Sequence, residues 1–109
     1  MKGIIFFSLM LFSSITLSAI EASGSYNVLR IDSYSEYGGG DVVVKLTTHT
    51  ANCSHGYWLK KNDPGFQANF SMVLAAYQAK NKIKLIAHTD QLWPGTGGKV
   101  CHVYTVRYE

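Results

Sequence analysis

The sequence predicts a mainly β domain with one helix, in the order β-β-β-α-β-β. Apolar and polar residues alternate in five stretches, which is typical of strands that bury one face. In residues 66–77, between the third and fourth stretches, apolar residues instead recur every three or four positions, as on one face of a helix. Glycine, asparagine and proline gather between these stretches and indicate turns.

The first two predicted strands form a hairpin. Residues 25–37 alternate, with Leu29 and Ile31 on one face. Residues 41–48 (DVVVKLTT) alternate more clearly and place Val43, Lys45 and Thr47 together on one face. Three consecutive glycines separate the two stretches and favour a turn.

The third predicted strand, residues 53–61, carries Trp58, which we expect to enter the core. A dense turn (NDPG) ends it. The helix then begins after an N-cap at Asp63 or at Asn69, and Asn81 is suited to end it. We expect one helical face to pack on the sheet: Phe66, Phe70, Val73, Leu74 and Tyr77. We expect the opposite side to face outward: Met72, Ala75 and Lys80.

Residues 82–88 and 99–108 are the last two predicted strands, and the loop 90–98 between them carries Trp93. A helix between the third and fourth of five strands is the element order of an OB-fold, a five-stranded Greek-key barrel. An open α+β sheet has the same order. We favour the OB-fold-like five-stranded barrel.

The N-terminal segment has the pattern of a secretory signal peptide. Lys2 precedes an apolar run over residues 4–20, and small residues follow the run. We therefore expect a signal peptide over residues 1–22, cleaved between 19 and 24, and a folded domain over residues 25–109. A retained anchor is the alternative, but the run contains serines and no basic cluster follows it. The protein is expected to be secreted or periplasmic, without stable membrane insertion after cleavage.

Cys53 and Cys101 are the only cysteines, and in an oxidising compartment they predict a disulfide. Closing a loop of about fifty residues stabilises a small domain by roughly 4 kcal/mol. A metal site is the competing interpretation, but no CxxC spacing supports it. No cofactor or metal is expected.

Charge and residue spacing argue against several functions. A net charge of +3 is small for a nucleic-acid-binding protein. No spacing of histidine, serine or acidic residues indicates a nucleophile with its base or a carboxylate pair, so we expect no enzyme. Five lysines cluster in the middle of the chain, either as a solvated rim or as a patch for anionic glycans or phosphate surfaces: Lys60, Lys61, Lys80, Lys82 and Lys84.

Aromatic residues are the best candidates for ligand binding. Trp93 lies in a glycine-rich loop, where its indole is either an exposed stacking platform for a sugar or a lid packed over the barrel end. With it we name Tyr57 and Tyr104 as candidate ligand-binding residues.

The stretch from about residue 41 to residue 107 resembles small exported OB-fold proteins related to toxin B subunits, especially that of subtilase cytotoxin. The features that carry this resemblance are Cys53 before an aromatic strand, the helical segment SMVLAAY, the strand IKLI, Trp93 and Cys101. It implies a disulfide-bonded barrel, often pentameric, that binds host glycans. No glycan-binding residue of that family matches an identifiable position here.

The sequence thus predicts an exported, non-enzymatic binding module whose ligand is a carbohydrate. The alternative is a structural or interaction subunit of the periplasm or cell surface, whose exposed aromatic residues are buried against a partner and which has no glycan ligand.

Overall fold

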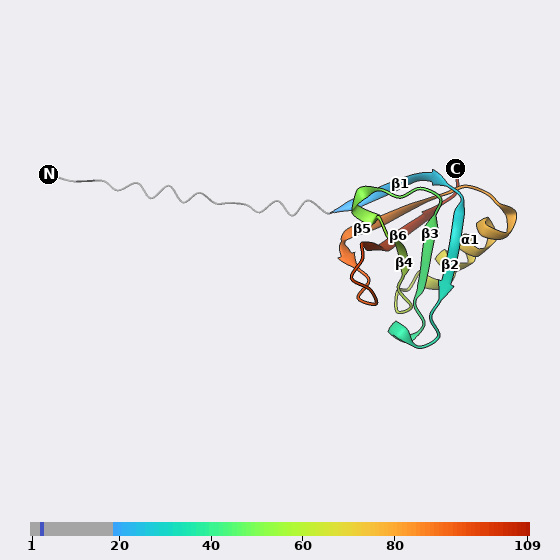
Figure 1. Ribbon diagram of the computed structural model, residues 1–109, viewed down its shortest axis with the longest axis horizontal. Helices are drawn as coiled ribbons and strands as arrows, with labels where there is room; N and C mark the ends of the chain where they lie inside the picture. Colours follow the sequence, from blue (N-terminus) through green and yellow to red (C-terminus); the bar gives the residue numbers. More distant parts are fainter. Residues whose placement is uncertain (1–2, 4–18) are drawn as a thin grey trace.

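A computed structural model describes Gly3 and residues 19–109 of the chain (Figure 1). Most of the expected signal peptide lies outside these residues. The described part contains one α-helix and six strands: β1 (Ile20–Tyr26), β2 (Val28–Ser33), β3 (Val42–Leu46), β4 (Gly56–Leu59), α1 (Phe66–Ala79), β5 (Ile83–Leu92) and β6 (Val100–Arg107). Two 3-10 helices, η1 (Tyr37–Gly39) and η2 (Ala51–Cys53), lie in the loops. No helix in the described residues is long and apolar enough to cross a membrane.

The six strands form one open mixed sheet in the order β1-β5-β6-β4-β3-β2. All neighbours are antiparallel except β4 and β6, which are parallel. The two edge strands, β1 and β2, are separated in the chain by Asn27 alone. Since two Cα–Cα steps span no more than about 7 Å, the sheet must curl until its edges meet at this residue. Figure 1 shows this corner, where β1 crosses the top and β2 descends from its end.

The expectation of a mainly β domain with one helix is confirmed, but the count of five strands is wrong. The stretch that we predicted as one strand, residues 25–37, contains the end of β1 and the whole of β2. The chain turns at Asn27, whose carbonyl accepts the N–H of Thr47 at 3.0 Å and whose side chain donates to the carbonyl of Lys80 at 2.9 Å. The alternation is interrupted just after the bend, because the register of β2 against β3 shifts between Val28 and Arg30. Ile31 therefore packs against the core whereas Leu29 is exposed, so the prediction that these two share one face is wrong.

The helix packs on one face of the sheet with Phe66, Phe70 and Val73 inward, as predicted, but the rest of the predicted face is wrong. Val73 is fully buried, whereas Leu74 is 40% exposed and Tyr77 is also exposed. Met72, which we expected to face outward, packs partly buried against the core, and Ala76 is buried. Each residue of a helix is rotated by about 100° from the previous one. The buried face of α1 includes Val73 and Ala76, and the residues that follow them, Leu74 and Tyr77, are turned toward solvent.

The ends of the helix also differ from expectation. Gly65 occupies the N-cap position, not Asp63 or Asn69. At the other end Lys80, with φ of 57°, adopts the left-handed conformation that we expected at Asn81.

The disulfide between Cys53 and Cys101 is confirmed, with Cα atoms 5.5 Å apart. It joins the segment before β4 to β6, next to the point where Tyr57 and Cys101 are paired across the two strands. The disulfide lies within the main core under α1, together with the inward residues of five strands: Val28, Val42, Val44, Leu46, Tyr57, Leu59, Ile83, Leu85, Ala87, Val103 and Val106.

Adjacent helix residues provide a test of this packing. We predict that Val73→Ala lowers the free energy of unfolding by about 2 kcal/mol, because it removes fully buried methyl groups and leaves a cavity. Leu74→Ala removes a larger side chain but should cost less than about 1 kcal/mol, because that side chain is partly in solvent. Urea unfolding of the two variants measures this. A larger loss for Leu74→Ala would mean that another surface covers it.

Strand β1 begins earlier than the domain boundary expected from the sequence. The carbonyl of Ala19 accepts the N–H of Thr89 at 2.7 Å, and the Ser23 hydroxyl accepts the N–H of Leu85 at 2.9 Å. Cleavage after residue 22 would therefore remove three of the seven residues of this edge strand. Cleavage after residue 23 would remove four of them, including the Ser23 hydroxyl that accepts from Leu85.

We predict that the signal peptide is cleaved between Ala19 and Ile20, because this position has a small residue and leaves β1 whole. Intact-mass analysis of the exported protein should give a chain that starts at Ile20. A chain that starts at Ser23 or Gly24 would contradict the prediction and would show that the first half of β1 is dispensable.

Candidate binding site

The face of the sheet opposite α1, which we call the outer face, carries a second apolar cluster. Val43, Trp58 and His102 are neighbours across β3, β4 and β6. Strand alternation turns them away from the main core, which takes Val42, Val44 and Tyr57 from the same strands. The cluster consists of four residues: Val43, Trp58, Trp93 and Val100. No residue of α1 belongs to this cluster, and the loop between β5 and β6 shields it by means of Trp93.

Trp93 is a packed lid and not an exposed platform. Its side chain is only 3% exposed, and its ring centroid lies 4.9 Å from that of Tyr34 and 5.2 Å from that of Tyr37. The indole Nε1–H donates to Oδ2 of Asp41 at 3.1 Å. Of the two alternatives that the sequence left open for Trp93, the structure has the lid.

Asp41 holds this lid from the start of β3. Its carboxylate is buried, and its second oxygen, Oδ1, accepts the backbone N–H of Lys61 at 3.0 Å. The carboxylate occupies the space where a β-carbon of residue 38 would lie, and Gly38 also has a left-handed φ of 66°. A glycine at position 38 is therefore a requirement for this arrangement.

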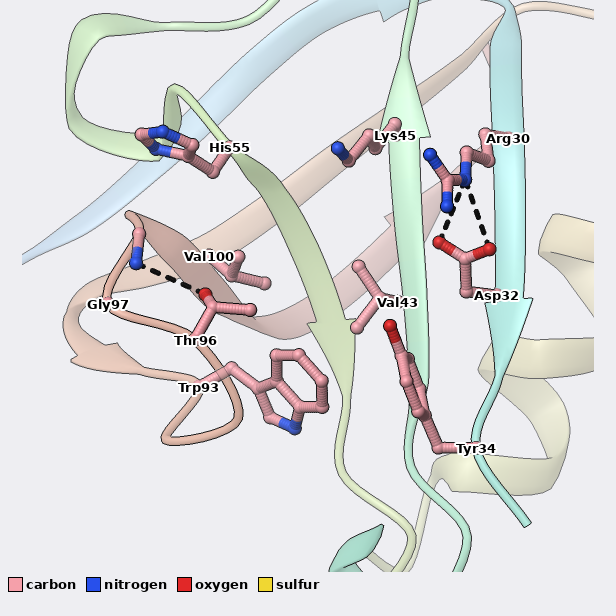
Figure 2. A pocket seen from close by; sticks show the side chains of 11 residues that line it. Arg30, Asp32, Tyr34, Val43, Lys45, His55, Trp93, Thr96, Gly97 and Val100 are labelled. Carbon is pink, nitrogen blue, oxygen red and sulfur yellow. Dashed lines mark hydrogen bonds and ion pairs between the residues drawn. The ribbon is translucent and has the colours of Figure 1, made fainter.

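Beside Trp93 the outer face contains a hollow of about 330 Å³, which we call the first hollow (Figure 2). Val43 and Val100 form its apolar floor, and Figure 2 shows Trp93 and Thr96 on one side of it with Lys45 across from them. Its lining also includes six further residues: Arg30, Asp32, Tyr34, His55, Gly97 and Gly98.

The rim of the first hollow is positively charged. Nε of Arg30 lies 2.9 Å from Oδ2 of Asp32, so these two charges offset each other. Lys45 makes no ion pair with any described residue. Burial lowers the pKa of the nearby His49, and the positive charges of Lys45 and His55 lower it further. The first hollow therefore offers an unpaired ammonium group above an apolar floor.

His55 fixes the loop that forms one wall of the first hollow. Its Nδ1 accepts the N–H of Lys99 at 3.0 Å, and its backbone N–H donates to the carbonyl of Lys99 at 3.1 Å. A β-carbon at position 98 would meet the His55 ring, so Gly98 allows this close approach. Sequence reasoning did not select His55 or Lys45. Lys45 had one signal, its place beside Val43 on one face of the predicted strand.

The three residues predicted to bind a ligand do not come together. Trp93 lines the first hollow, whereas Tyr57 is buried in the main core, and this burial raises the pKa of its hydroxyl. Tyr104 is 62% exposed and borders a different hollow, with its ring edge-on to His88. Among the five lysines, Lys84 forms an ion pair with Glu109 and Lys61 lies over the ring of Phe66.

Comparisons with protein-family models, with curated proteins and with solved structures found no match to the chain. Within residues 19–109, no three histidine, cysteine, aspartate or glutamate side chains are grouped so that they could hold a metal ion.

Truncating the lid tests its structural role. We predict that Trp93→Ala lowers the free energy of unfolding by about 3–5 kcal/mol, because it empties the centre of the outer-face cluster and leaves Asp41 short of a donor. Denaturant unfolding measures the change, and Tyr104→Ala is the control, since it truncates an exposed ring on the same sheet. A loss below about 1 kcal/mol for Trp93→Ala would mean that the loop is not fastened by its indole.

Proposed function

We propose that the protein is an exported carbohydrate-binding module built on an OB-type scaffold. The topology supports the scaffold when β1 and β2 are counted as one strand bent at Asn27. That strand then pairs with the second strand (β3) at one end and with the fourth (β5) at the other. The helix falls between the third and fourth strands, as in OB-folds.

The position of the first hollow is the observation that carries the proposal. It lies over β3 and is flanked by Tyr34, from the loop between β2 and β3, and by residues 96–98, from the loop between β5 and β6. In the five-strand count these are the loops between strands one and two and between strands four and five. OB-folds bind oligosaccharides and oligonucleotides at these loops and on the adjoining strands.

The chemistry of the first hollow favours an acidic sugar. The C–H face of a sugar ring suits the apolar floor of Val43 and Val100 and the exposed aromatic ring of Tyr34. A carboxylate on the sugar would give Lys45 the partner that it lacks among the described residues. By the resemblance to toxin B subunits, the ligand is a host glycan and the module is a homo-oligomer, with a pentamer as the expected form.

A second function, that of an interaction subunit without a glycan ligand, draws support from exposed apolar side chains. Leu29 on the edge strand β2, Leu92 at the end of β5 and Tyr108 near the C-terminus are all exposed. Such residues can be buried against a partner. This function predicts no binding of any sugar at the first hollow.

Calorimetric titration with acidic and neutral monosaccharides tests the proposal. We expect at least one of glucuronic acid, galacturonic acid and N-acetylneuraminic acid to bind more tightly than glucose or galactose. Lys45→Met should weaken that binding about tenfold or more, because it removes a charge-assisted hydrogen bond. Lys82→Met is the matched control, since it removes the same charge from an exposed position outside the lining of the first hollow. Absence of binding by all three acids, or equal losses in the two variants, would contradict the proposal.

A further inference from the structure

The outer face contains a second hollow on the other side of the lid. It measures about 360 Å³. Trp93 lines the first hollow and the next residue, Pro94, lines the second, so the loop separates the two. Two tyrosine rings pack against Trp93. Tyr34 lines the first hollow and Tyr37 lines the second. The lining of the second hollow comes from three segments of the chain: Tyr37, Gly38, Asp41, Trp58, Lys60, Asn62 and Pro94.

Trp58 gives this second hollow an unusual property. Its side chain is only 7% exposed, and its indole N–H has no hydrogen-bond acceptor among the described residues. Buried N–H groups nearly always have a partner. Trp58 lines the second hollow and not the first. Trp58 therefore brings a buried aromatic ring with an unused N–H to the wall of the second hollow.

The other polar groups of the second hollow also present donors. Lys60 and Asn62 are exposed, and their side chains make no hydrogen bond or ion pair with any described residue. Asp41 is the one acid in the lining, and both of its oxygens are already engaged, by Trp93 and by the backbone of Lys61. Donors without acceptors fit a ligand that is rich in oxygen acceptors.

We propose that the second hollow is a further sugar subsite, so that the module binds an acidic oligosaccharide laid across Trp93 and Pro94. The acidic unit occupies the first hollow beside Lys45. The adjoining unit rests on Tyr37 and accepts hydrogen bonds from Lys60 and Asn62. This inference depends on the proposed function and adds to it a minimum ligand length of two sugar units.

Three matched pairs of sugars test the length requirement: glucuronic acid with a hyaluronan tetrasaccharide, galacturonic acid with tetragalacturonic acid, and N-acetylneuraminic acid with 3′-sialyllactose. In the pair whose monosaccharide binds, we expect the longer member to bind at least about tenfold more tightly. Lys60→Met and Asn62→Ala should each remove most of that gain and leave the affinity for the monosaccharide unchanged. Lys82→Met, outside both hollows, should change neither affinity.

Trp58→Phe separates a binding role from a structural one. It keeps an aromatic ring and removes the N–H, so the gain with chain length should fall while the melting temperature is maintained. The inference would be overturned if the two sugars of each pair bound with equal affinity. It would also be overturned if both Lys60→Met and Asn62→Ala still bound the longer sugar more tightly than the monosaccharide by the original factor. Those results would leave the first hollow as a monosaccharide site, whereas failure of every sugar to bind would contradict the proposed function itself.

Discussion

The buried carboxylate of Asp41 is the interaction on which the outer face depends. It lies after three glycines and accepts one hydrogen bond from the Trp93 indole and one from the backbone of Lys61. A buried carboxylate is tolerated only when such donors replace the water that it loses. Three loops from different parts of the chain are thereby held at one point. Both hollows border the lid that this carboxylate holds, so their shapes follow from it.

The two faces of the sheet are covered in different ways, and this difference produces the candidate site. The curled sheet and a 14-residue helix, which contacts β2, β4 and β6, together bury the inner face. A single indole covers the centre of the outer face and leaves space on either side of it. Apolar surface with few covering side chains, next to unpaired donors and a free ammonium group, is what a small polar ligand needs.

The backbone of β4 contributes to the first hollow through a missing side chain. Gly56 is paired with Val100 on one side and lies next to Lys45 on the other. A β-carbon at this position would lie 2.9 Å from the carbonyl oxygen of Val44, and the residue has a φ of 118°. The aliphatic part of the Lys45 side chain instead lies over Gly56. A glycine in a strand here marks a place where another group approaches closely.

The sequence by itself determined the class of fold, the helix and the disulfide, because each depends on a local period or on a count of two cysteines. It also placed Val43 and Lys45 together on one strand face. Tertiary structure alone decided the bend at Asn27, the inward stripe of α1 and the burial of Trp93. Alternation shows that a strand has two faces but not which segment covers each of them. That depends on strand register, and the shift between His88 and Leu92 in the pairing of β5 with β6 places Trp93 over Val43 and Val100.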